Sequence, residues 1–229
     1  MITVISLGGS MIAPDAVDTA YLLQFKQMLE SHLAAFPQAR FVLVAGGGAP
    51  ARLYQNAYRE IMNGAPASGD EADWIGIMAT RLNAQLVRAV FAAYDPPPVV
   101  TDPTAPFEWN GRVLVAAGWK PGFSSDNDAV ILARRFGART LINLSNVERV
   151  YTADPRTDPA AQPLDALSWK DFRALVGTGW TPGKNTPFDP VASKHAEEAG
   201  LTVICAAGAN LDNVAAILTG RPFTGTTIG

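Results

Sequence analysis

The 229-residue sequence has one cysteine, two histidines and no long apolar run. One cysteine cannot form an intramolecular disulfide or a zinc cage, and the isolated His32 and His195 offer no cluster of metal ligands. A Ser-His-Asp arrangement and a Gly-x-Ser-x-Gly elbow are also missing. These absences argue against zinc enzymes and serine hydrolases. Cys205 lies in an apolar stretch and is expected to be a core residue.

The sequence also lacks an excess of positive charge. It has 18 Lys and Arg against 21 Asp and Glu, a formal net charge of −3, which disfavours binding of a nucleic acid polymer. The first residues lack the cationic lead of a signal peptide, and no apolar segment reaches the roughly 20 residues that span a bilayer. We therefore expect a cytoplasmic protein without a membrane partner, although helix N-termini can still bind small anions.

Short β-branched apolar runs alternate with longer amphipathic segments along the whole chain. With 48% hydrophobic and 17% charged residues the chain can bury a full core. The alternation predicts an α/β fold, with helices on both faces of a mainly parallel sheet. Strands are expected at 3–7, 41–45, 99–101, 112–117, 140–144 and 201–206. Helices are expected at 16–35, 49–63, 71–93, 127–136, 169–176, 190–199 and 211–218.

Helix boundaries carry recognisable residues. Asp189 followed by Pro190 predicts an N-cap with proline at the first helical position. Gly137 and Gly200 stand where C-terminal caps are expected, directly before strands. Two segments rich in proline and aspartate, 94–108 and 153–167, interrupt the alternation and are expected to be irregular.

Glycine clusters follow two of the expected strands directly, at residues 8–9 and 46–48. In open α/β sheets ligands bind beyond the carboxyl ends of strands, where glycine lets the backbone approach a phosphate and the next helix N-terminus attracts anions. The alternative for either cluster alone is a tight turn. Two clusters together favour phosphate binding, but neither matches a P-loop or a Rossmann fingerprint.

Two cations and one polar segment stand near these loops or at helix starts. Arg52, one turn beyond the second cluster, can reach an anion there or can be a solvated surface residue. Lys194 lies early in a helix, where the dipole disfavours a cation, and its alternative role is an ion pair with Glu198. Residues 122–126 are either a capping segment or phosphate donors. Asp73 and its acidic neighbours are explained by the helix start alone.

In order and spacing these segments resemble the amino-acid kinase superfamily and, within it, the archaeal-type UMP kinases, over nearly the whole chain. Asp-x-Ile-Gly-Ile at 73–77 and Thr-Arg-x-Asn-Ala at 80–84 are the most specific motifs. The other matching stretches are 7–10, 44–48 with 51–52, 121–126, 146–147, 150–155, 189–194 and 225–228.

The resemblance implies a three-layer αβα sandwich in one domain, 1–229, with an acceptor side at about 1–135 and an ATP side at about 136–229. It implies transfer of the γ-phosphoryl group of ATP to UMP with Mg²⁺, and a hexameric assembly. The implied catalytic residues are Lys194, Arg52, Gly9 and Gly48. The implied ATP site is Gly8, Gly9, Ser10, Gly48, Arg52, Ser145, Asn146, Tyr151 and Asp154. The implied UMP site is Gly47, Asp73, Gly118, Trp119, Lys120, Pro121, Gly122, Phe123 and Ser124.

This reaction needs no general base, because the second pKa of a phosphate monoester is about 6 and the acceptor is already ionised at neutral pH. The sequence departs from the family pattern at three places, one of which is Trp119 and Lys120, where the acceptor loop of the family normally has smaller or different residues. Phe123-Ser-Ser125 replaces His-Thr-Thr, and Glu148-Arg149 replaces Asp-Gly. Two alternatives therefore stay open: a kinase for another phosphate acceptor, such as isopentenyl phosphate, and a non-catalytic nucleotide- or oxoanion-binding member like the molybdenum storage proteins.

Overall fold

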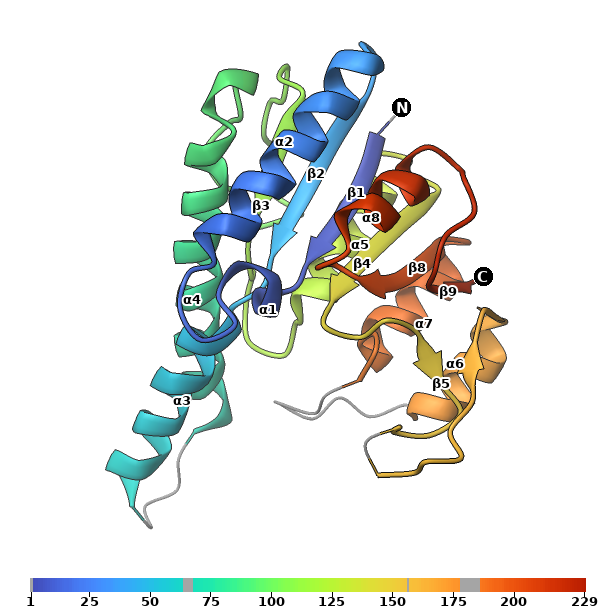
Figure 1. The fold of residues 1–229 in the computed structure, drawn as a ribbon. Coiled ribbons are helices and arrows are strands. Elements are labelled where there is room, and N and C mark those ends of the chain that lie inside the picture. The colour runs from blue at the N-terminus through green and yellow to red at the C-terminus, as the bar shows by residue number, and fades with distance from the viewer. Residues whose placement is uncertain (1, 64–67, 156, 178–185) are drawn as a thin grey trace.

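The computed structural model describes residues 2–63, 68–155, 157–177 and 186–229, and a seven-stranded sheet forms its centre (Figure 1). The strands lie in the order β3-β2-β1-β4-β8-β9-β7. The first five are parallel to one another, and β9 runs antiparallel to β8, so the prediction of a mainly parallel sheet is confirmed. The sheet strands are β1 Ile2–Leu7, β2 Arg40–Ala45, β3 Val113–Ala116, β4 Thr140–Ser145, β7 Ala166–Leu167, β8 Thr202–Ala207 and β9 Thr226–Ile228.

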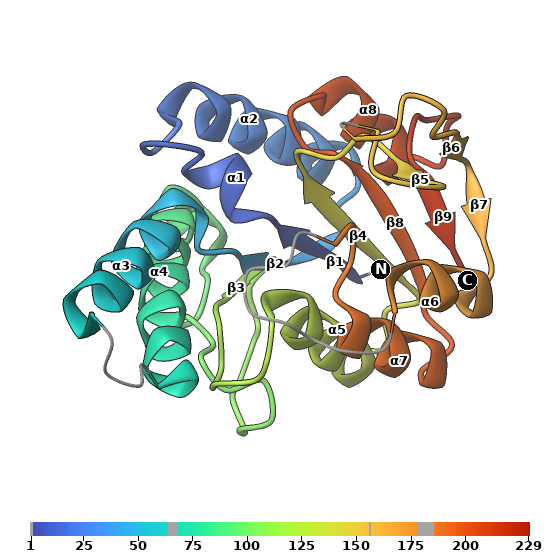
Figure 2. The same cartoon turned by 90° about the horizontal axis from the view of Figure 1, so that it is seen from below.

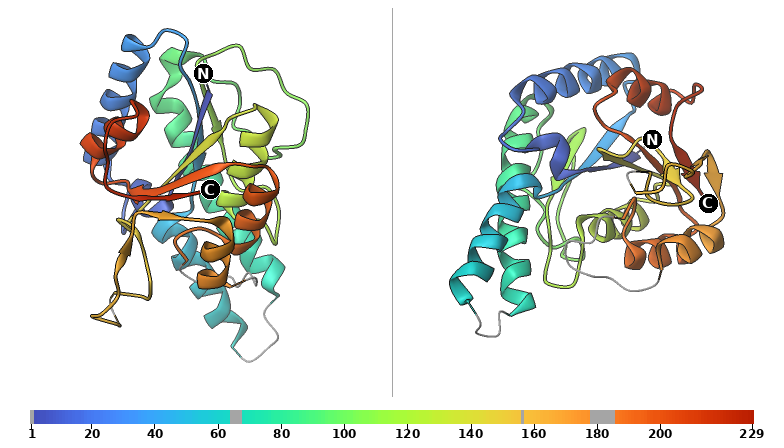
Figure 3. Two further views of the ribbon diagram at one scale, coloured as in Figure 1. Left: turned by 90° about the vertical axis from the view of Figure 1, so that its right-hand side faces the viewer. Right: turned by 60° about the horizontal axis from the view of Figure 1, so that its bottom comes forward.

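Helices cover both faces of the sheet. Figure 2 shows α1, α2 and α8 over one face and α5, α6 and α7 over the other. Helix α3 packs along α4, and the two extend past the carboxyl ends of the strands (Figure 3). None of the helices in the described ranges is long and apolar enough to cross a membrane. The helices are α1 Gly9–Ile12, α2 Thr19–Ala35, α3 Gly48–Met62, α4 Gly69–Val90, α5 Ser125–Arg135, α6 Trp169–Val176, α7 Pro190–Glu198 and α8 Leu211–Leu218.

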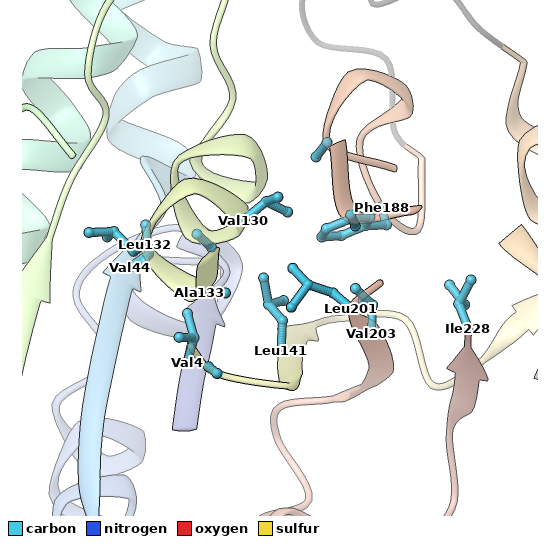
Figure 4. Packing of buried hydrophobic residues seen from close by; sticks show 14 of the residues in the cluster. Val4, Val44, Val130, Leu132, Ala133, Leu141, Phe188, Leu201, Val203 and Ile228 are labelled. Atoms are coloured by element: carbon cyan, nitrogen blue, oxygen red, sulfur yellow. The ribbon is translucent and has the colours of Figure 1, made fainter. Parts of the chain in front are cut away.

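The core consists of two apolar clusters, one on each face of the sheet. Successive residues of a strand point to opposite faces. Val4 and Val44 therefore pack toward α5 and α7, in the cluster that Figure 4 shows with Phe188. Ile5 and the other alternate residues pack toward α2 and α8. Cys205 is a free thiol, 3% exposed, in the first cluster, which confirms its expected core position.

The expected helix boundaries are confirmed where a cap was recognised. The Asp189 carboxylate accepts from the Ala192 amide at 2.7 Å, with proline at the first helical position. Gly137 and Gly200 have φ of 63° and 62°, the left-handed conformation that glycine adopts easily. Helix α2 begins three residues later than expected, because Asp18 is its N-cap.

Other expectations were wrong in detail. The expected strand at 99–101 forms only an isolated bridge between Val100 and Ala116, since the three prolines before it supply no amide donors. The segment 153–167 contains two short strands rather than none. One of these, β6 (Pro163–Leu164), pairs with β5 (Val150–Tyr151) in a separate ribbon, and the other is β7. Helix α1 and strand β9 were missed because three or four residues carry too little periodicity.

Candidate active site

The glycine loops lie together at the carboxyl edge of the sheet. The Gly8 amide donates to Leu144 O of β4 at 2.8 Å, and the Gly46 amide donates to Leu7 O of β1 at 2.9 Å. In the sheet, β2 and β3 lie on one side of β1, and β4 and β8 lie on the other. The strand order therefore reverses at β1. Such a point is where open α/β sheets bind ligands.

The two loops touch each other through backbone atoms. A Cβ atom added to Gly9 would lie 1.9 Å from the Gly48 nitrogen, and one added to Gly48 would lie 2.5 Å from Gly9 O. Gly48 also has φ of 65°, which disfavours any other residue. The Ala49 amide donates to Ala13 O at 2.9 Å and ties α3 to the end of α1. The glycines therefore do more than make turns, because they let two loops share one narrow space.

Helix α3 places its N-terminus at this contact, with Gly47 as the N-cap. The first amides of a 15-residue helix have no intrahelical acceptors and attract anions. Arg52, in the second turn, donates from Nη2 to Pro14 O at 3.2 Å and is exposed. The structure thus brings Arg52 beside the segment that follows Gly9 and Ser10.

Helix α4 connects the second glycine loop with the predicted acceptor loop, residues 118–124. The Asn83 side chain, 3% exposed, donates from Nδ2 to Gly46 O at 2.8 Å and to Gly47 O at 3.1 Å. Three turns earlier, Oδ2 of Asp73 accepts from the Gly122 amide at 3.1 Å. Asp73 and the acceptor loop, predicted to share a site, are therefore in contact.

Aromatic rings and a cation gather on the acceptor loop. The Trp119 and Phe123 rings meet edge to face with centroids 4.9 Å apart. The Lys120 ammonium lies 3.9 Å from the Trp119 centroid and 4.9 Å from that of Phe123, within range of cation–π attraction. Ser124 caps α5, its Oγ accepting from the Asn127 amide at 3.2 Å, so the capping interpretation of this serine is confirmed.

Sequence reasoning named Asp126 only within the segment 122–126, as part of a cap or of a group of phosphate donors, although it connects three elements. Its carboxylate accepts from Ser6 Oγ at 2.9 Å and from the Asp189 amide at 3.2 Å, joining α5 to β1 and to the start of α7. Burial raises the pKa of Asp126 to about 6, and the nearby Asp189 adds to the rise. No sequence signal distinguishes it from an ordinary carboxylate in a first helical turn, which the helix dipole favours anyway.

Lys194 lies on the exposed side of α7. Its ammonium is 3.9 Å from Glu198 Oε1, and its side chain is 59% exposed. This is the ion pair that the sequence offered as the alternative to a catalytic role. The N-terminus of the same helix is held at the sheet edge, because the Asp189 amide donates to the Asp126 carboxylate. The Lys194 ammonium is not part of this contact.

The residues predicted for the adenine nucleotide follow β4. Ser145 ends that strand, and its Oγ accepts from the Val147 amide at 3.1 Å. Asn146 comes next in the chain, Tyr151 lies in β5, and the Asp154 carbonyl accepts from the Asp158 amide at 2.8 Å. At the departure from the family pattern, Arg149 pairs with Asp165 at 2.5 Å and lies 3.7 Å from Glu148, so its guanidinium is used within the protein.

The fold is shared with known proteins. A model of the amino acid kinase family matches residues 1–207. The chain belongs to this family. Among solved structures, the uridylate kinase of Archaeoglobus fulgidus superposes with a TM-score of 0.81 at 31% identity, over all of both chains. A UMP kinase of Bacillus anthracis, at 18% identity and a TM-score of 0.78, shares the fold.

Similar sequences cover nearly the full chain. A uridylate kinase of Hyperthermus butylicus is 33% identical over 223 residues, 95% of this chain and 94% of the relative. A uridylate kinase of Methanospirillum hungatei is 34% identical over 230 residues, 98% of this chain and 93% of the relative. The resemblance inferred from the motifs is therefore confirmed.

Proposed function

We propose that this protein is a UMP kinase, which transfers the γ-phosphoryl group of ATP to UMP and releases UDP and ADP. The observation that carries the proposal is the near full-length similarity to uridylate kinases. The contact between Gly9 and Gly48 supports it, because two anionic groups must be brought close together in this reaction. The enzyme acts in the cytoplasm, in pyrimidine nucleotide synthesis.

Phosphoryl transfer here consists of alignment and charge stabilisation. Gly8, Gly9 and Ser10 border the ATP phosphates, and the N-terminus of α3 at Gly48 faces the transferred group. Arg52 and Lys194 supply positive charge. Asp126 fixes the positions of β1, α5 and α7 relative to one another through its hydrogen bonds with Ser6 and Asp189. The segment 136–229 binds the adenine nucleotide through Ser145, Asn146, Tyr151 and Asp154, and the segment 1–135 binds UMP.

On the acceptor side, Asp73 binds the ribose and the loop 118–124 encloses the nucleotide. Mg²⁺ neutralises the phosphates when it is bound. Within the described residues, no three His, Cys, Asp or Glu side chains are grouped to hold an ion. Mg²⁺ keeps several waters and needs few protein ligands, so the phosphates of ATP would carry it.

A coupled assay of ADP release tests this function with UMP, CMP, dUMP and isopentenyl phosphate as acceptors. We expect kcat/KM to be highest with UMP and at least about tenfold lower with dUMP, because a site that bonds a hydroxyl rejects an acceptor lacking it. A higher kcat/KM with isopentenyl phosphate would contradict the proposal. Nucleotide binding without ADP release would instead make the protein a non-catalytic member.

We further propose that the enzyme is a homo-oligomer, expected to be a hexamer. The outer sides of α3 and α4 carry several exposed apolar side chains. Such a patch on a protein surface marks an interaction site. A second copy of the chain is the occupant that fits the family resemblance. The patch on α4 consists of Trp74, Met78 and Leu82, which lie on one side of the helix at intervals of four, and the exposed apolar residues of α3 are Leu53, Tyr54 and Ile61.

Charge placed in this patch should dissociate the oligomer. Met78 and Leu82 are 57% and 69% exposed, so glutamates there disturb no core. We expect the Met78→Glu, Leu82→Glu double variant to have a smaller mass by light scattering than the wild type. Leu23→Glu on α2, a residue that is 55% exposed, serves as the control and should leave the mass unchanged. A monomeric wild type at micromolar concentration would refute the assembly.

A further inference from the structure

The first residues of the acceptor loop are held by side chains from two helices. The Arg81 guanidinium on α4 donates from Nε to Gly118 O at 3.3 Å and from Nη2 to Trp119 O at 3.0 Å. The Trp119 amide donates to Asp128 Oδ2 on α5 at 3.1 Å. The Gly118 amide donates to Thr80 Oγ1 at 2.8 Å. The amides and carbonyls of both residues are therefore bound to side chains from α4 or α5.

Asp128 is fully buried, and within the described residues its Oδ1 has no hydrogen-bond partner. Burial raises the pKa of its carboxyl to about 7, with Asp126 and Asp102 adding to the rise and the Trp119 amide and Arg81 opposing it. A buried carboxylate without full hydrogen bonding costs stability. Within the described part of the chain, the Trp119 amide is the one hydrogen-bond partner of the Asp128 carboxylate, so this side chain is directed at the loop.

Gly118, at the start of the acceptor loop, has no room for a larger side chain. A Cβ atom added to Gly118 would lie 2.9 Å from Thr80 Oγ1 and 3.3 Å from Ile77 Cγ1. Thr80 Oγ1 in turn donates to Ile77 O at 2.6 Å, which fixes its lone pairs toward the Gly118 amide. The start of the loop is thus fixed, while its far side meets α4 again at Asp73 through the Gly122 amide.

We propose that Arg81 and Asp128 are positioning residues that fix the start of the acceptor loop and thereby set the affinity for the acceptor nucleotide. Neither residue needs to touch the nucleotide. They act through the backbone of Gly118 and Trp119, which carries the Trp119 ring and leads directly into Lys120. The proposal rests on the UMP kinase function for the identity of the acceptor.

Helix α4 provides a matched control for Arg81. Arg88, two turns later, makes the same type of contact with a different loop: its Nε donates to Pro97 O at 2.6 Å and its Nη2 to Pro96 O at 3.2 Å. Both arginines are half-buried. Arg81→Gln and Arg88→Gln therefore remove equal charge and equal numbers of hydrogen bonds from one helix, and differ in which loop they release.

Kinetics test the proposal. We expect Arg81→Gln and Asp128→Ala to raise KM for UMP about tenfold, the effect of losing one or two hydrogen bonds, while kcat and KM for ATP change less than about threefold. Asp128→Asn should recover most of the affinity, because its amide oxygen still accepts from Trp119. Arg88→Gln should leave KM for UMP unchanged. Equal KM shifts for the two arginine variants, or no shift in either, overturn the proposal.

Amide hydrogen exchange tests the positioning without turnover. Exchange at residues 117–124 should be faster in Arg81→Gln and Asp128→Ala, whereas Arg88→Gln should accelerate exchange near Val99 instead. Unchanged exchange at 117–124 refutes the positioning role. If the wild type prefers another acceptor, KM for that acceptor is compared in its place. In that case the proposed UMP kinase function is wrong, but the same variants still test the positioning role of Arg81 and Asp128.

Discussion

Replacing Gly48 with alanine is expected to lower kcat/KM for UMP at least about 100-fold, since a displacement of about 1 Å at reacting groups costs that much. The new Cβ atom would lie 2.5 Å from both Ala13 O and Gly9 O, so one glycine loop must move away from the other. These contacts are backbone atoms and cannot rotate aside. Steady-state kinetics together with thermal unfolding measure the effect.

Gly137→Ala separates this crowding from backbone strain. Gly137 has φ of 63°, close to the 65° of Gly48, but a Cβ atom there would meet nothing within 4 Å. Its alanine variant should be destabilised by about 1 kcal/mol, the usual cost of a left-handed conformation, and should keep its kcat/KM. If both variants lose activity equally, the loop contact is not what catalysis requires.

Removal of the Lys194 side chain is expected to lower kcat about 100-fold with little change in either KM. A donor that faces charge developing in the transition state contributes about that much, and its loss affects the chemical step. The exposed position of Lys194 beside Glu198 makes this a demanding test, because the ammonium must leave the ion pair to face the phosphoryl group. Single-turnover measurements of Lys194→Ala report the step directly.

Lys26→Ala is the matched control for Lys194→Ala. Lys26 pairs with Glu30 at 2.8 Å, with the same spacing of four residues, on a helix that carries no site residue. A helical pair at this spacing contributes about 0.3–0.5 kcal/mol to stability. Both variants should therefore lose a similar small stability, and only Lys194→Ala should lose turnover. Equal turnover in the two would leave Lys194 as a surface ion pair.

Much of the candidate site follows from local sequence. The glycine clusters after two buried strands predict loops at one sheet edge, because parallel strands end on the same side. The Asp189 cap predicts the start of α7. The role of Asp126 could not be predicted, because its partners Ser6 and Asp189 lie 120 and 63 residues away in the chain. Likewise, nothing local indicates that Asn83 binds the carbonyls of Gly46 and Gly47.

The sequence by itself determined the layered α/β architecture, the helix caps and the family, since these depend on periodicity, on residues within one turn and on motif order. Only the tertiary structure decided which groups meet. It placed Gly9 against Gly48, set Arg81 and Asp128 on either side of the acceptor loop, and left Lys194 paired with Glu198. The physical reason is that such contacts depend on how the sheet and helices pack, which no short stretch of sequence encodes.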